Sequence, residues 1–218
     1  FGDGGILAFG ANCFNMAFVL PYLGFFLYKF LMKKTCMRKL SAAIGAYVGI
    51  NAAAFCAAVE FGIQPLLFKD AAGNALYCPY PLSISIPAMM IGHITLFGLA
   101  EIVLTVVVLT FIEKVTPKAL DVVPEKTSFK PLYIFIAVLI ILTPLGLLAT
   151  GTAWGEWGAD EIASLVSGGK ALGYTPAGMQ RGFELSTIFP DYSMAGLPDW
   201  IGYILSAVVG VALVVIIF

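Results

Sequence analysis

Five long apolar runs, separated by polar segments, dominate the pattern along this chain. A helix needs roughly 20 apolar residues to cross a hydrocarbon core of about 30 Å, and each run comes close to or exceeds that length. The runs lie at about 11–31, 40–63, 83–112, 132–150 and 200–218. The pattern therefore predicts an all-α fold, a polytopic membrane helix bundle with five spans.

The polar segments between the runs carry basic residues unevenly. Two segments are rich in them: Lys29, Lys33, Lys34, Arg38 and Lys39 after the first run, and Lys114, Lys118, Lys126 and Lys130 between the third and the fourth. The alternate segments, 64–82 and 151–199, hold the other three of the twelve basic residues. By the positive-inside rule the basic segments are cytoplasmic, so the amino terminus is predicted outside and the carboxyl terminus inside the cell.

Composition supports a multi-pass membrane protein and excludes several other classes. Hydrophobic residues make up 60% of the chain and charged residues 11%, against about 45–50% and about 25% in soluble domains. A net charge of −1 gives no basic surface for nucleic acid. The four cysteines lie far apart without a CxxC pair, and no phosphate-binding loop, GxSxG or HExxH motif is present. A zinc site, a disulfide framework and an enzyme are all disfavoured.

One segment divides the chain. TPKALDVVPEKTSFKP (116–131) mixes prolines, charges and small polar residues, which is typical of a linker. The predicted organisation is a membrane domain at 1–112, a cytoplasmic linker at 113–131 and a two-span hairpin with a long outer loop at 132–218. Within that loop the sequence predicts a short helix at 160–166, and Trp154, Trp157 and Trp200 are predicted to form an interfacial aromatic belt.

Three segments carry a family resemblance. They are FGDGGILAFGANCFNM (Phe1 to Met16), GINAAAFCAAVEFGIQPLLF (Gly49 to Phe68) and IPAMMIGHITLFGLAEIVLT (Ile86 to Thr105). They resemble the CbiM/NikM family, the substrate-capture components of energy-coupling-factor importers for cobalt and nickel. The hairpin at 132–218 is similar in topology to CbiN, a small accessory subunit that is fused to CbiM in some relatives.

The resemblance implies a function, a set of partners and a location in the cell membrane of a prokaryote. Cobalt or nickel ions would be transported rather than permanently bound, with a transmembrane coupling subunit and separate ATPase subunits as partners. The family holds its metal with a Met-His amino terminus and a histidine of an early loop, and no segment here matches either one. The resemblance therefore implies that this chain is the carboxy-terminal part of a longer protein, with its primary ligands upstream of Phe1.

Two ionisable residues lie within the third predicted span. His93 is the single histidine, and Glu101 follows eight residues later, which separates the two by about 80° around a straight α-helix. Ionisable groups inside membranes usually mark a polar interior or a transport pathway. His93 is predicted to be a buried hydrogen-bonding residue, with direct metal ligation as the alternative, because one imidazole cannot build a site. Glu101 is predicted to bridge helices or cap a polar interior.

Asn12 and Asn15 lie three residues apart, so a helix places them on one face. They can support a metal-bearing loop through hydrogen bonds to its ligands, or they can join helices to each other, and the sequence favours neither. Gly45 and Gly49 form a small-xxx-small packing face, with docking of the coupling subunit as the alternative. Glu60 is predicted to be a solvated helix end.

Two further function classes remain beside metal capture. One is a non-transporting accessory or scaffold membrane protein, in which the polar residues only pack helices. The other is an intramembrane enzyme, which is disfavoured because no nucleophile and base stand out as a pair. The sequence does not distinguish cobalt from nickel.

Overall fold

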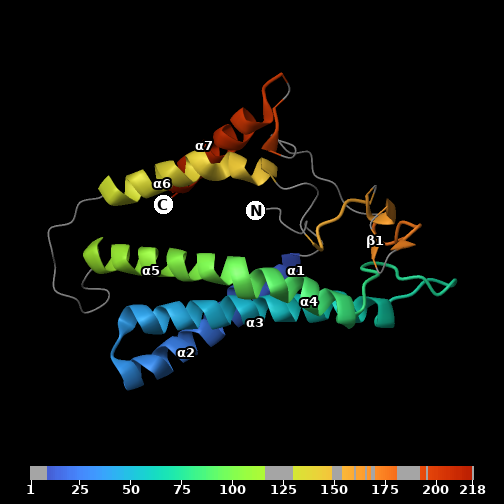
Figure 1. Cartoon of the computed structure of the whole chain (residues 1–218), viewed down its shortest axis with the longest axis horizontal. Coiled ribbons are helices and arrows are strands. Elements are labelled where there is room, and N and C mark those ends of the chain that lie inside the picture. The colour runs from blue at the N-terminus through green and yellow to red at the C-terminus, as the bar shows by residue number, and fades with distance from the viewer. Residues whose placement is uncertain are drawn as a thin grey trace. The chain divides into compact units, whose positions relative to one another are not determined.

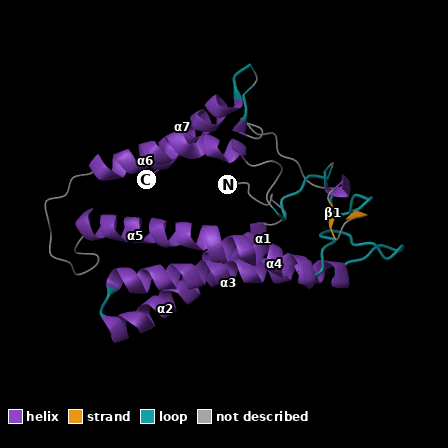
Figure 2. Ribbon diagram, in the orientation of Figure 1, coloured by secondary structure: helices purple, strands orange, loops and turns teal. Residues whose placement is uncertain are grey.

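The computed structural model describes residues 9–115, 130–148, 154–159, 161–164, 166–167, 170–180, 192–194 and 196–217. Helices make up most of this part of the chain, as Figures 1 and 2 show. The described residues fall into two compact units. The first is drawn from Phe1–Glu113 and Thr152–Phe183, and the second from Lys114–Gly151 and Glu184–Phe218.

The first unit contains three long helical rods. The elements of the unit are α1 (Phe9–Asn12), the π-helical segment η2 (Cys13–Val19), α2 (Leu20–Thr35), α3 (Arg38–Leu67), α4 (Leu82–Gly92), the π-helical segment η3 (His93–Phe97) and α5 (Gly98–Val115). Since α1, η2 and α2 are continuous, as are α4, η3 and α5, the rods span Phe9–Thr35, Arg38–Leu67 and Leu82–Lys114. A tight turn joins the first two rods, where Cys36 adopts a left-handed conformation with φ of 54°.

Small residues on α3 let α2 approach it closely (Figure 1). A Cβ atom added to Gly45 would lie 2.6 Å from the carbonyl oxygen of Gly24, and one added to Gly49 would lie 2.7 Å from that of Leu20. Lipid offers no hydrophobic force between helices, so close backbone packing of this kind is what holds membrane helices together.

A second face of α3 packs against α4. Ser85 of α4 is fully buried, and its hydroxyl donates a hydrogen bond of 2.8 Å to the carbonyl oxygen of Ala58. A Cβ atom on Gly62 would meet Leu82 at 2.7 Å, so glycine is required for this approach too. With α2 on one face and α4 on another, α3 is the central helix of the first unit.

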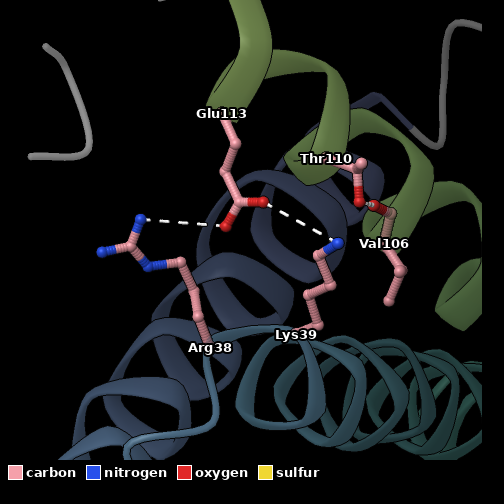
Figure 3. Close-up of polar contacts among 5 residues, drawn as sticks. All are labelled: Arg38, Lys39, Val106, Thr110 and Glu113. Carbon is pink, nitrogen blue, oxygen red and sulfur yellow. Dashed lines mark hydrogen bonds and ion pairs between the residues drawn. The ribbon is translucent and has the colours of Figure 1, made fainter. Parts of the chain in front are cut away.

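The basic end of this unit is joined by ion pairs between α3 and α5 (Figure 3). Glu113 lies 3.8 Å from an Arg38 guanidinium nitrogen and 3.9 Å from the Lys39 ammonium. One turn earlier on α5, the hydroxyl of Thr110 donates to the carbonyl oxygen of Val106 at 2.7 Å. These contacts tie the start of the central helix to the end of the third rod.

The second unit is a helical pair. Its elements are α6 (Lys130–Leu142), the 3₁₀ segment η5 (Thr143–Leu148) and α7 (Asp199–Ile217), and α7 packs against both others. Of the described helices, the three rods and α7 are long and apolar enough to cross a membrane, while Tyr133–Leu148 is a shorter apolar helix. The predicted helical class is confirmed. The number of segments that cross the membrane and their orientation stay predictions.

The described part of the loop between η5 and α7 contains little regular structure. It holds a 3₁₀ turn, η6 (Ile162–Ser164), and two short antiparallel strands, β1 (Val166–Ser167) and β2 (Lys170–Ala171). The helix predicted at 160–166 is wrong apart from that one turn, because Val166 pairs with Ala171 in the strand ladder. Asp160 and Leu165 lie outside the described residues.

Candidate functional site

A buried polar pair joins the first rod to the central helix. The side-chain amide nitrogen of Asn15 donates a hydrogen bond of 2.8 Å to Oε2 of Glu60. Asn15 is 3% exposed, and Glu60 is half-buried. The prediction that Glu60 is a solvated helix end is therefore wrong: the residue lies two turns inside α3 and accepts a hydrogen bond from the neighbouring helix.

Asn15 lies in the π-helical segment η2, whose wider turn explains how it faces α3. The backbone N–H of Leu20 bonds to the carbonyl oxygen of Asn15, five residues earlier. A π turn inserts one residue into an α-helix and rotates the side chains around it, and such turns occur often at functional sites. The structure buries Asn15 and leaves Asn12 exposed, so the two asparagines do not share one buried face.

Two buried amide oxygens have no hydrogen-bond donor among the described residues. They are Oδ1 of Asn15 and Oδ1 of Asn51. The Asn51 amide nitrogen donates to the carbonyl oxygen of Tyr47 at 2.8 Å, within the same helix. A buried acceptor without a donor costs about 1–3 kcal/mol, so each of these oxygens favours a ligand, an ion or a water molecule.

His93 begins the second π-helical segment, η3. Its Nδ1 lies 2.8 Å from the carbonyl oxygen of Met89, and because a carbonyl only accepts, Nδ1 carries the proton. In the neutral ring this leaves the lone pair of Nε2 available to a proton or a metal. The Phe97 ring lies beside the imidazole, with 5.1 Å between the ring centroids.

The wide turn of η3 also frees a backbone carbonyl. Tyr47 of α3 donates its hydroxyl to the carbonyl oxygen of Ile94 at 2.8 Å, and so satisfies it. Gly98 makes this approach possible, since a Cβ atom there would lie 2.6 Å from the Tyr47 ring. The π turn is thus held to the central helix by a specific contact.

The structure does not join His93 to Glu101. Glu101 accepts a hydrogen bond of 3.3 Å from the hydroxyl of Thr105, and no hydrogen bond or ion pair links it to His93 in the described part of the chain. The angle expected between them assumed a straight α-helix, and η3 breaks that assumption. Gly45 and Gly49, the remaining candidates, face α2 within this chain.

An aromatic cluster lies at the end of the first unit where α3 meets the 68–81 loop. Trp154 lies edge-on to Phe61 with ring centroids 5.7 Å apart, and Tyr80 packs against both Trp154 and Trp157. These two tryptophans therefore contact protein rather than forming a simple lipid-facing belt, whereas Trp200 at the start of α7 is 52% exposed.

The 68–81 loop is itself anchored to α3. The backbone N–H of Cys78 donates to the side-chain carbonyl of Gln64 at 2.9 Å. Burial raises the pKa of the Cys78 thiol, although a backbone hydrogen bond involving Tyr80 acts in the opposite direction. Burial also raises the pKa of the Tyr80 hydroxyl, and the neighbouring Cys78 adds to that shift.

These positions define a class of protein: a multi-helix membrane protein with isolated polar side chains between its helices. Within the described residues, no three of the histidine, cysteine, aspartate and glutamate side chains come together to hold a metal ion. The roles of His93, Glu101 and Asn15 at a site stay predictions, and the sequence analysis did not predict the hydrogen bond between Asn15 and Glu60.

Comparison with known proteins identifies the family. Residues 1–119 match the CbiM family, described as the cobalt uptake substrate-specific transmembrane region, and residues 130–218 match the PDGLE domain. The chain belongs to the CbiM family and carries a PDGLE domain after the family region. The resemblance seen in the sequence is confirmed, and the PDGLE match assigns the region that the sequence likened to CbiN.

Two curated relatives match nearly the whole chain. The probable fused nickel transport protein LarMN of Lactiplantibacillus plantarum is 46% identical over 97% of this chain, which spans 64% of that protein. The fused nickel transport protein NikMN of Rhodobacter capsulatus is 43% identical over 99% of this chain, which spans 67% of that protein. The solved structure of a transition metal transporter is 50% identical in sequence to this chain, with a TM-score of 0.48. The match covers 50% of this chain and 48% of the transporter chain.

Proposed function

We propose that this chain is the metal-capturing membrane component of an energy-coupling-factor importer for nickel or cobalt ions. The observation that carries the proposal is its similarity, over almost its whole length, to two proteins named as fused nickel transport proteins. Hydrolysis of ATP then belongs to separate partner subunits, with a transmembrane coupling subunit between them and this chain. The chain itself is not an enzyme.

The metal chemistry assigned to the site follows from the ligands that late first-row ions prefer. Nickel and cobalt favour imidazole and other nitrogen donors, whereas calcium and magnesium favour oxygen cages. We place the primary ligands upstream of Phe1, as the family resemblance implies. His93 offers one further nitrogen, Nε2, from within the third rod, and Asn15 belongs to a polar pair with Glu60 that supports the site.

We assign the orientation of the chain in the membrane from the distribution of charge and from loop packing within the first unit. Arg38, Lys39 and Glu113 cluster at one end of its rods, which we assign to the cytoplasm by the positive-inside rule. The 68–81 loop and the 154–180 segment pack together. The backbone N–H of Gly178, for example, donates a hydrogen bond of 2.8 Å to the carbonyl oxygen of Leu76. Both segments are poor in basic residues, which supports an outer location for each.

The carboxy-terminal region has an accessory role in this proposal. Residues 1–112 form the carboxy-terminal part of the capture domain, 113–131 the cytoplasmic linker, and 132–218 the hairpin that assists metal loading. The contacts of Trp154 with Phe61 and Tyr80 support such assistance, since they connect the hairpin's loop to the capture domain.

The test is metal uptake by cells that lack their own nickel and cobalt importers and express the intact gene with its partner subunits. We expect accumulation of radioactive nickel or cobalt, and none when the ATPase partners carry a substitution that abolishes hydrolysis. Equal accumulation with and without this chain would contradict the proposal and favour the alternative, a non-transporting scaffold protein.

A further inference from the structure

Glu60 is an ionisable group inside a helix that is long and apolar enough to cross a membrane. It lies seven residues before Leu67, the end of α3, which corresponds to about 10 Å along the axis. A carboxylate at such a depth is costly unless it is paired or faces water, so it usually marks a pathway or a site. Groups around Glu60 must therefore compensate the negative charge of its carboxylate.

The hydrogen bond from Asn15 does not neutralise that charge. An ionised carboxylate has about four lone-pair positions, and the Asn15 amide, which is itself neutral, fills one of them. Arg38 and Lys39 form their ion pairs with Glu113, at the basic end of the unit. Glu60 thus has a polar contact in the described structure but no positive partner there.

A second acceptor beside Glu60 lacks a donor. Because a carboxylate only accepts, the Nδ2 of Asn15 faces Glu60, and its Oδ1 is left buried with no partner among the described residues. An amide oxygen and a carboxylate that both lack compensation are best satisfied together by a cation. Rotation of the Asn15 amide would turn its oxygen toward such an ion.

We propose that Glu60 and Asn15 form a second, weaker site that holds the transported divalent cation after it leaves the capture site. This inference rests on the proposed function. The ligands would be a Glu60 carboxylate oxygen and the Asn15 amide oxygen, with water completing the shell. Oxygen donors bind nickel and cobalt less strongly than nitrogen donors do, and a site on a transport path must bind weakly enough to release its ion.

Glu60→Gln is the decisive variant, because glutamine keeps the size of the side chain and a carbonyl oxygen that can still accept from Asn15. A merely structural role would survive this change, and a role that needs the charge would not. In cells with the partner subunits we expect the initial rate of nickel uptake to fall by about tenfold or more. Purified full-length protein carrying Glu60→Gln should still bind nickel stoichiometrically at the capture site.

Glu101→Gln is the matched control, because Glu101 is another carboxylate within a predicted span. In the described structure Glu101 accepts a hydrogen bond from the hydroxyl of Thr105. Glu101→Gln should lower uptake much less than Glu60→Gln does. Titration of the purified full-length protein with cobalt gives an independent readout. The wild type and Glu101→Gln should show a weaker second binding event after the tight one, and Glu60→Gln should lack it.

Three outcomes would overturn the inference. Uptake by Glu60→Gln at the wild-type rate would show that the charge has no role in transport. A wild-type titration without a second event would mean that water alone satisfies the pair, and loss of tight binding in Glu60→Gln would place Glu60 in the capture site itself. If the wild type with its partners transports neither metal, the proposed function fails instead.

Discussion

The close approach of α2 and α3 predicts a measurable cost for adding one methyl group. A Cβ atom at Gly45 would lie 2.6 Å from the Gly24 carbonyl oxygen, whereas ordinary contacts of such atoms begin at 3.4 Å. The helices would therefore have to separate locally by 3.4 − 2.6 = 0.8 Å. The obstacle is backbone, so no side-chain rotation relieves it.

Overpacking of this kind costs about 1–3 kcal/mol, and the better helix propensity of alanine returns up to about 1 kcal/mol. Gly45→Ala should therefore lower the free energy of unfolding by up to about 2 kcal/mol, and should leave the protein about 1–3 kcal/mol less stable than a glycine-to-alanine change at an open helical position. Unfolding of the detergent-solubilised protein by increasing mole fractions of sodium dodecyl sulfate, followed by circular dichroism, measures this change.

Gly210→Ala is the matched control, because no atom lies within 4 Å of a Cβ added there and the residue is inside α7. It should leave stability unchanged or raise it by up to about 1 kcal/mol. If Gly45→Ala proves as stable as Gly210→Ala, the close packing of α2 on α3 is refuted.

Three further predictions concern topology, metal binding and the hairpin. Cysteines introduced in the 64–82 segment should react with a membrane-impermeant maleimide added from outside, and cysteines introduced in 32–39 should not. The native Cys78 thiol should react slowly at neutral pH, because burial raises its pKa and so lowers the fraction present as thiolate. The reverse labelling pattern would overturn the orientation. The 218-residue chain alone should not bind nickel or cobalt tightly, and micromolar calorimetric binding abolished by His93→Ala would disprove this. Deleting 132–218 from the full-length protein should leave stoichiometric metal binding but lower uptake, and loss of binding in a folded deletion variant would make the hairpin part of the site.

The helices could be read from the sequence because lipid imposes a simple length and polarity rule. Every predicted run coincides with a described helix, including the run at 40–63, which lies inside α3. Within the described residues, the run at 132–150 changes from α6 to the 3₁₀ segment η5, where Pro144 lacks the N–H that an α-helix would use.

The partnership of Asn15 and Glu60 could not be read from the sequence. The two residues are 45 positions apart, and their meeting depends on the π turn of η2, which has no reliable signal in residue types. The clue that the sequence offered was a glutamate three residues before the end of the apolar run at 40–63. In the same way, Trp154 and Trp157 read as an interfacial belt because their ring partners lie far away in the sequence.

We propose that this chain belongs to the component that captures nickel or cobalt ions for an importer energised by separate ATPases. The most direct test of this proposal is metal accumulation in proteoliposomes that contain the full-length protein together with its coupling and ATPase subunits. We expect accumulation of nickel or cobalt only when ATP is supplied on the side of the ATPases and only when this chain is present. Accumulation without ATP, or equal accumulation by the partner subunits alone, would contradict it.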